Sequence, residues 1–286
     1  FQAEDGIRDT SRGLVGSEMC IRDRVSAVHH ALPNFAQGGG GAVVAMTFDS
    51  RFAYAHYNWM SANKAALEAM VRVLQRLGVS LSCPIDQTCC GQPAFNSGYR
   101  RQARVAARHF IEVFDEAETI VCPSGSCVNM VRHHYEQLFE NEPQWLPRAV
   151  NLARRTFEFS EYLVDVLGID DLGAHFKGRV TYHDSCHLLR GIGVRQQPRT
   201  LLQHVAGINF IEMRDSDYCC GFGGTFSVKY PDISDAMVTD KVKNIIDTKA
   251  DAVVGCDMGC LMNIQGKLSR LGSPIKVLHL AQILAS

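Results

Sequence analysis

Two stretches built around adjacent cysteines decide the organisation of this chain: QTCCGQPAFNSGY at residues 87–99 and DYCCGFGGTFSVKY at residues 217–230. In each stretch the cysteine pair is followed by glycine and then by small and polar residues. The two pairs start at Cys89 and Cys219, so the stretches predict an internal repeat of about 130 residues.

The sequence after each cysteine pair repeats the same order of structural signals. A stretch with helical periodicity follows each pair, at residues 100–117 and at residues 234–250. Each stretch leads into a short β-branched segment that ends in cysteine, namely TIVCPSGSC at 119–127 and AVVGCDMGC at 252–260. We therefore expect helix, strand and cysteine in this order in both halves.

The segment before the second pair completes the repeating unit. Strand signals at 180–182 and 208–213 flank a helix signal at 198–206. Strands that alternate with helices predict a parallel or mixed sheet with helices packed on it. We expect an α/β fold with two pseudo-repeated cysteine-rich domains, each a small mostly parallel sheet flanked by helices. Cysteines just past the strand ends would gather at one edge of such a sheet.

The expected domain boundary lies near residue 145, where Pro143 and Pro147 interrupt the helical pattern between the repeats. The first repeat then covers residues 25–145, and linking helices with the second repeat cover residues 146–286.

The first residues of the chain match nothing in the repeat. Residues 1–24 show no helical or strand periodicity, and they have neither the basic start nor the apolar run of a signal peptide. They resemble translated sequencing-adaptor DNA, so we expect an artefactual, disordered leader. We expect residues 25–60 to be foreign or misread sequence, although GAVVAMTF at 41–48 has the pattern of a strand.

The overall composition is that of an ordinary soluble globular protein. Of the 286 residues 46% are hydrophobic and 21% are charged, and the formal net charge is −1. This charge gives no support for nucleic-acid binding or for a polybasic membrane patch. The sequence holds no run of about 18 apolar residues, so we expect no transmembrane segment and a cytoplasmic location.

The cysteines are the unusual part of the composition, because the chain contains 11 of them. Neighbouring cysteines do not readily close a disulfide, but two thiols beside a glycine suit a tight loop that presents both sulfurs to one metal centre. The second repeat offers five thiols from three separated segments: Cys186, Cys219, Cys220, Cys256 and Cys260. Such a set fits zinc or an iron–sulfur cluster, and the adjacent pair favours the cluster.

Not every cysteine calls for a metal. Cys83 lies in VSLSCPI, at residues 79–85, which we interpret as a strand with a small buried thiol. Two alternatives to the cluster stay open at this point. One is a zinc-stapled scaffold that only binds partners, and the other is a thiol exchanger, which would lack the usual C-x-x-C motif.

Several longer strings resemble the CCG-type cysteine-rich family: TCCGQPAFNSGY, PSGSC, CHLLRG, CCGFGGTFSVKYPDIS, DMGCLMNI and VLHLAQIL. The resemblance covers about residues 61–286. It implies an iron–sulfur oxidoreductase subunit that acts in L-lactate oxidation to pyruvate within a three-protein complex and is active only with its partner subunits. The CCG-containing subunit of heterodisulfide reductase and the iron–sulfur subunit of glycolate oxidase are more distant relatives. The resemblance implies 4Fe–4S clusters, which are non-cubane in the heterodisulfide reductase relative.

Carried over residue by residue, the family pattern matches the second site in full and the first site in part. The second site matches at Cys186, Cys219, Cys220 and Cys260, with Cys256 as a further candidate. The first site matches at Cys89, Cys90 and Cys127, with Cys122 as a further candidate. The spacing of the second site puts a leading cysteine near residue 56, where the chain has His56. We therefore expect the first site to lack one ligand.

Four polar side chains near the second site are candidates for work on a substrate. Arg190 or Lys229 could hold the carboxylate of a small 2-hydroxy acid, and His183 or His187 could move its proton. The alternative is that they are solvated loop residues or helix caps. CGFGGT does not match a nucleotide-binding loop, because it lacks both the GxGxxG order and the GK[ST] ending.

Overall fold

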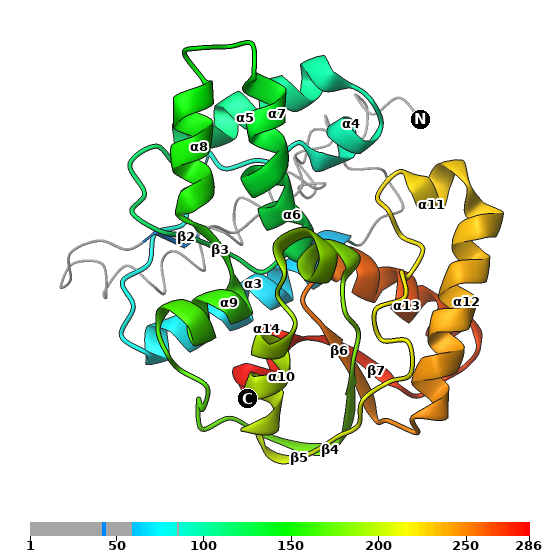
Figure 1. Ribbon diagram of the computed structural model, residues 1–286. Coiled ribbons are helices and arrows are strands. Elements are labelled where there is room, and N and C mark those ends of the chain that lie inside the picture. Colours follow the sequence, from blue (N-terminus) through cyan, green and yellow to red (C-terminus); the bar gives the residue numbers. More distant parts are fainter. Residues whose placement is uncertain (1–41, 44–58, 85) are drawn as a thin grey trace, which may run out of the picture.

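The computed structural model describes residues 42–43, 59–84 and 86–286, and its strands form two parallel sheets (Figure 1). The first sheet has the order β1-β2-β3, with β1 at Ala42–Val43, β2 at Ile120–Cys122 and β3 at Thr156–Glu158. The second sheet has the order β5-β4-β6-β7, with β4 at His175–Tyr182, β5 at Ala206–Phe210, β6 at Ala252–Gly255 and β7 at Lys276–His279.

Helices connect the parallel strands, because a parallel pair needs a crossover connection. In the first half these are α3 (Trp59–Arg76), α4 (Gln92–Asn96), α5 (Arg100–Val113), α6 (Gly125–Asn129), α7 (Tyr135–Phe139), α8 (Leu146–Arg154) and α9 (Phe159–Glu161). In the second half they are α10 (Gln196–Gln203), α11 (Phe226–Lys229), α12 (Pro231–Asp247) and α13 (Met258–Arg270), and α14 (Leu280–Leu284) follows β7. Short π-helical segments are η2 (Met130–His134), η3 (Tyr162–Val166) and η4 (His187–Gly191).

Strand β6 shows how the second sheet is buried on both faces. Ala252 and Val254 belong to a core cluster with residues of α3, α10 and α14, whereas Val253 belongs to a cluster with residues of α12 and α13. Successive side chains of a strand point to opposite faces, so a strand covered on both sides is apolar throughout. This arrangement confirms the predicted α/β fold of parallel sheets flanked by helices.

Helix α3 joins the two halves of the molecule. Its buried residues, among them Leu67, Met70 and Leu74, recur with helical spacing and lie in one core cluster with residues of the second half such as Leu284. Figure 1 shows α3 and α14 side by side, and Arg76 Nη2 donates a hydrogen bond to the Leu284 carbonyl at 2.5 Å. The apolar core therefore runs from one half into the other.

One expected strand is absent from the described residues, and the domain boundary near residue 145 stays a prediction. Val79–Pro84 contains no strand, because this segment pairs with no other described segment; Cys83 still packs against the core. Strand β3 joins the first sheet although it follows the boundary expected near 145. The leader at 1–24, most of residues 25–60 and His56 lie outside the described residues.

Candidate metal centre

The glycines of the two CCG loops share a left-handed backbone conformation. Gly91 and Gly221 have φ angles of +85° and +80°, and a Cβ at Gly221 would lie only 2.6 Å from the Ser234 carbonyl oxygen. Only glycine adopts this left-handed conformation without strain and leaves that space free. In both loops the glycine N–H donates to the first thiol of the pair at 3.4 Å, from Gly91 to Cys89 and from Gly221 to Cys219.

The second cysteine of each pair is held by its backbone carbonyl. The Cys90 carbonyl accepts a hydrogen bond from Tyr135 Oη at 3.0 Å, and the Cys220 carbonyl accepts one from Asn263 Nδ2 at 2.8 Å. Both donors come from helical segments that begin just after the next strand of the repeat. Each CCG loop is thus held by a hydrogen bond from a helical segment of its own half, as expected for a repeated unit.

Four thiols converge in the second half. Cys186 follows β4, Cys219 and Cys220 lie in the CCG loop, and Cys260 lies in the first turn of α13. Hydrogen bonds from Cys186 and Cys220 hold the pKa of the Cys219 thiol well below its usual value, and Cys220 also contacts Cys260. We call these four residues the second thiol group.

A matching set of thiols lies in the first half. Hydrogen bonds from Cys122 and Cys90 lower the pKa of Cys127, and Cys90 also contacts Cys89. Cys127 is the third residue after the N-cap of α6, Ser124, just as Cys260 is the third residue after the N-cap of α13, Asp257. Cys89, Cys90, Cys122 and Cys127 form the first thiol group, so Cys122 stands with the three cysteines that match the family pattern.

Cys256 lies in a different environment from the second thiol group. It is fully buried, and its Sγ accepts a hydrogen bond from Tyr182 Oη at 3.4 Å. Burial raises the pKa of the Cys256 thiol, and its other neighbours are Glu158 and Ser160. Cys256 immediately precedes the N-cap of α13, just as Pro123 immediately precedes the N-cap of α6. At this position Cys256 packs in the core cluster that contains residues of both halves.

Asp257 links the two thiol groups. Its Oδ1 accepts the N–H of Gly259 at 3.2 Å within its own helix, while its Oδ2 accepts the N–H of Ser126 at 3.1 Å from α6. The hydroxyls of Ser97 and Thr225, which follow the two CCG loops, also share a hydrogen bond of 2.8 Å. The two thiol groups therefore lie on either side of one short polar contact region.

A buried ion pair braces the segment that carries Cys186. The guanidinium of Arg199 donates to both carboxylate oxygens of Asp184, at 2.9 and 2.7 Å, and Ser216 Oγ donates to the same carboxylate at 2.8 Å. Burial opposes ionisation of Asp184, but the hydrogen bonds and charge of Arg199 lower its pKa. These contacts fix the loop after β4 two residues before Cys186.

Two further buried polar groups lie beside the second thiol group. His183 is 1% exposed, and burial together with the charge of Lys241 lowers its pKa to about 3. Lys241, also 1% exposed, donates from Nζ to the carbonyls of Asp215 at 2.7 Å and Ser216 at 3.1 Å. Sequence reasoning missed Lys241, although its spacing from Ser234, Val238 and Ile245 is that of the buried face of α12.

The other candidate residues for substrate handling lie further out. His187 Nδ1 is 3.7 Å from Cys186 Sγ and is partly buried. Arg190 and Lys229 are exposed in the last turns of η4 and α11. Their roles toward a substrate remain predictions.

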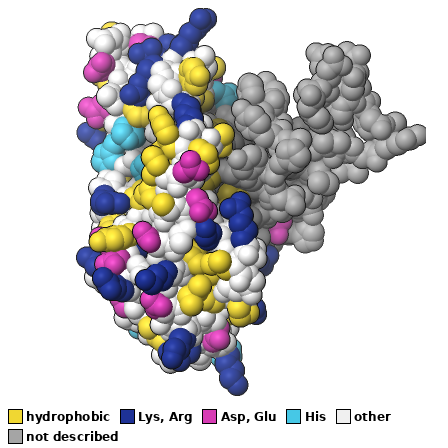
Figure 2. Space-filling model, turned by 90° about the vertical axis from the view of Figure 1, so that its right-hand side faces the viewer, with side chains coloured by type: hydrophobic (Ala, Val, Ile, Leu, Met, Phe, Trp, Pro, Cys, Tyr) yellow, Lys and Arg dark blue, Asp and Glu magenta, His cyan; other side chains and the backbone are white. Residues whose placement is uncertain are grey.

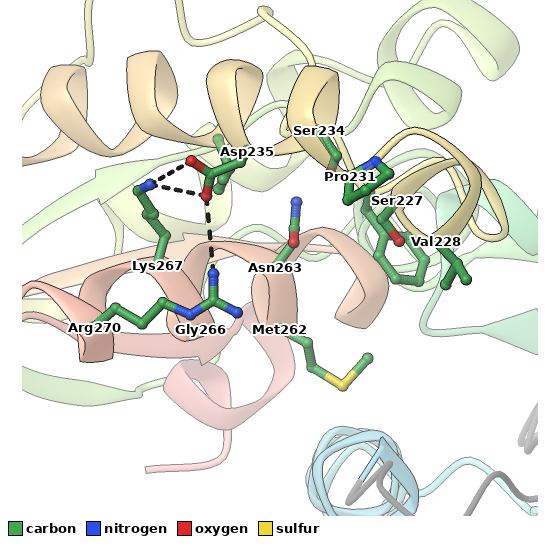
Figure 3. A pocket seen from close by; sticks show the side chains of 12 residues that line it. Ser227, Val228, Pro231, Ser234, Asp235, Met262, Asn263, Gly266, Lys267 and Arg270 are labelled. Atoms are coloured by element: carbon green, nitrogen blue, oxygen red, sulfur yellow. Dashed lines mark hydrogen bonds and ion pairs between the residues drawn. The ribbon is translucent and has the colours of Figure 1, made fainter.

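A pocket of about 330 Å³ lies between α12 and α13, next to the CCG loop of the second half. Figure 3 shows Lys267 and Arg270 on α13 facing Asp235 on α12, at 2.8 and 3.8 Å. Asn263, whose amide holds the Cys220 carbonyl, also lines the pocket. Since Asp235 already pairs with both cations, an acidic ligand would have to displace that carboxylate.

The surface next to this pocket carries charges of both signs. Figure 2 shows Lys and Arg side chains interspersed with Asp and Glu, and exposed hydrophobic side chains among them. Among the described residues, no helix is long and apolar enough to cross a membrane.

Comparison with known families defines the class of protein. The model of a family described as CCG, a cysteine-rich domain, matches residues 53–132 and 180–265, which together are more than half of the chain. The chain therefore belongs to the CCG cysteine-rich family, and the two matches correspond to the two repeats. A second family model, described as enoyl-(acyl carrier protein) reductase, matches residues 21–76, most of which lie outside the described residues.

Within this family the chain belongs with the proteins named Lactate utilization protein A. It is 50% identical over 214 residues to the one from Oceanobacillus iheyensis, a match that covers 75% of this chain and 87% of the relative. The one from Anoxybacillus flavithermus is 48% identical over 217 residues, covering 76% of this chain and 91% of the relative.

A solved structure shares the fold at low identity. The crystal structure of a hypothetical protein from Helicobacter pylori aligns with a TM-score of 0.52 and 12% identity, covering 91% of this chain and 53% of that chain. This likeness concerns the fold alone.

The donor atoms of both thiol groups suit a soft metal centre. Four thiolates from separate segments are the donor set of iron–sulfur clusters and of structural zinc. The glycine N–H groups that donate to Cys89 and Cys219 are of the kind that tunes a thiolate-bound metal. The residues present therefore fit the metal centre that the family resemblance implies.

Proposed function

We propose that this chain is the iron–sulfur subunit of a complex that oxidises L-lactate to pyruvate, and that it relays electrons through clusters of the 4Fe–4S type. The observation that supports this proposal is the convergence of four thiols in each half, built by matching CCG loops. The names of the relatives support lactate as the 2-hydroxy acid.

In the proposed reaction, this chain accepts electrons from lactate oxidation one at a time. Oxidation of a 2-hydroxy acid to the 2-oxo acid releases two electrons and two protons, and a bound iron–sulfur cluster supplies reversible one-electron chemistry. The thiols of the two groups would hold the clusters, and the glycine N–H donors would stabilise the thiolate charge. We propose that other subunits of the complex deliver and remove the electrons, in the cytoplasm.

The test is metal analysis of protein purified without oxygen. We expect iron and acid-labile sulfide, visible absorption and an electron paramagnetic resonance signal after reduction. Cys219→Ser should remove the signal of the second centre, because Cys219 contacts both Cys186 and Cys220. Cys83→Ser is the matched control, since Cys83 belongs to neither group and packs against the core.

One observation also favours a protein of another class, a zinc-stapled scaffold for partner subunits. The ligand atoms of His183, Cys220 and Cys260 lie within 4.8 Å of one another, which suits a single ion. A colourless anaerobic preparation with stoichiometric zinc and no sulfide would establish the scaffold and refute the redox proposal.

The substrate needs a separate experiment. With the partner subunits added, we expect the reconstituted complex to reduce an artificial acceptor with L-lactate faster than with glycolate. A preference for glycolate, or for a disulfide substrate, would assign the chain to the glycolate oxidase or heterodisulfide reductase type instead.

A further inference from the structure

Two fully buried histidines in the second half differ in the hydrogen bonds that their rings make. His279 uses both ring nitrogens: Nε2 bonds the Pro123 carbonyl at 2.9 Å, and Nδ1 accepts the N–H of Ala281 at 3.1 Å. His183 is as deeply buried, yet neither of its ring nitrogens makes a hydrogen bond of good geometry with the described residues, although the backbone of Ser216 lies close enough to raise its pKa. A buried polar side chain without a partner is costly and calls for an explanation.

The protein groups around His183 are already engaged. The neighbouring Ser216 carbonyl accepts hydrogen bonds from the Asp184 N–H at 3.1 Å and from Lys241 Nζ at 3.1 Å. The Asp184 carboxylate is taken by Arg199 and Ser216.

The imidazole of His183 lies beside two thiols of the second thiol group. One ring nitrogen lies within 4.8 Å of the sulfur atoms of Cys220 and Cys260, and this is the one such set of three metal-binding side chains in the described part of the chain. A neutral imidazole carries a lone pair on one nitrogen, and this makes it a common metal ligand. Its partner is therefore expected at the second thiol group itself.

We infer that His183 is a fifth protein donor of the second metal centre and that it binds the metal through a ring nitrogen, alongside Cys220 and Cys260. This inference rests on the proposed function, since it requires that the second thiol group hold a metal. A neutral nitrogen donor in place of a further thiolate leaves less negative charge on the centre, and this raises its reduction potential relative to an all-thiolate centre.

The experiment uses the full chain labelled with ¹⁵N at histidine and reconstituted with iron and sulfide without oxygen. Pulsed electron paramagnetic resonance of the reduced protein should show the coupling of a directly bound histidine nitrogen. This coupling should be lost in His183→Ala and in His183→Gln. It should be retained in His187→Ala, which removes an imidazole 3.7 Å from Cys186 Sγ, and in His204→Ala, which removes an exposed one.

The outcomes separate the ligand assignment from the function. A cluster without histidine nitrogen coupling in the unsubstituted protein overturns the role of His183 and leaves the iron–sulfur function standing, whatever the stability of the variants. Loss of the coupling in His187→Ala alone would make His187 the ligand and overturn the inference as well. If the unsubstituted protein takes up no iron and sulfide, the proposed function and this inference fail together.

Discussion

At the scale of single residues, a buried positive charge lies beside the second thiol group. Lys241 is buried, and within the described part of the chain its ammonium group donates to two carbonyls and to no carboxylate. Burial lowers the pKa of Lys241, and the negative charges of Cys220 and Asp217 partly oppose this effect. A thiolate-bound metal centre is the anion that such a cation would balance.

Replacing Lys241 with methionine should lower the reduction potential of the second centre. The buried positive charge stabilises the more negative reduced state, so its loss makes reduction harder. We expect the equilibrium constant for one-electron reduction to fall at least tenfold, which is about 59 mV. A redox titration followed by electron paramagnetic resonance measures this shift.

Lys243→Met is the control, because it removes the same charge from an exposed position two residues further along α12. An equal shift in both variants would mean that net charge, rather than the buried ammonium group, sets the potential.

Glu158 should make stability depend on pH in an unusual direction. Burial raises its pKa from 4.5 to about 7. Between these values the unfolded chain is ionised while the folded chain holds the proton, so stability falls as pH rises and levels off above about 7. The difference corresponds to about 3 kcal/mol.

Chemical denaturation between pH 4.5 and 8 tests this expectation. Glu158→Gln should remove the decline, since the amide stays neutral, and the exposed Glu136→Gln should keep it. A decline of the same size in Glu158→Gln would assign it to another group.

At the scale of elements, the CCG loop shows how a short motif positions a helix. The left-handed glycine lets α12 approach so closely that the Ser234 carbonyl occupies the space of a side chain, while Ser234 Oγ donates to the Gly221 carbonyl at 2.8 Å. The loop and the helix therefore hold the cysteine pair as one unit.

Gly221→Ala should damage the second centre more than a comparable change nearby. The new Cβ would clash with the Ser234 carbonyl, and an alanine at this positive φ would also be strained. We therefore expect the free energy of unfolding to fall by about 3 kcal/mol and the iron content of that centre to fall as well. Gly224 has φ +66° but no atom within 4 Å of an added Cβ, so Gly224→Ala should cost only about 1 kcal/mol. Urea denaturation and iron analysis compare the two, and equal effects would contradict the steric argument.

Much of the element order could be predicted from local patterns, but the partners of individual residues could not. Strand β6 and helix α12 follow from a β-branched run and from 3.6-residue periodicity. The surroundings of Cys256 depend on its place one residue before the cap of α13, which motif spacing does not show. VSLSCPI has a strand-like pattern but finds no partner strand in the described part of the chain, because pairing is decided by the whole fold.

At the scale of the whole molecule, one of the core clusters contains residues of both repeats. Leu74 of α3 is fully buried in the cluster that also contains residues of α10, β6 and α14. This association of distant segments could not be predicted from the internal repeat, which suggests two self-contained halves.

Leu74→Ala should therefore destabilise both halves together. We expect a loss of about 2–5 kcal/mol for this buried leucine and a single unfolding transition. Denaturation followed by fluorescence and by thiol reactivity measures this, with Val105→Ala, at an exposed position, as the control. Two separate transitions, of which only one shifts, would show that the halves unfold independently.

The contact between α3 and α14 also bears on how the chain is made. Arg76 and the Leu284 carbonyl are 208 positions apart, so this part of the core cannot close until α14 has left the ribosome. Contacts between such distant segments slow folding, and the part of α3 that packs on α14 stays without this partner until α14 has been made. The nascent chain thus spends that period with hydrophobic surface and free thiols exposed, a state in which protection by chaperones and a reducing environment matter most.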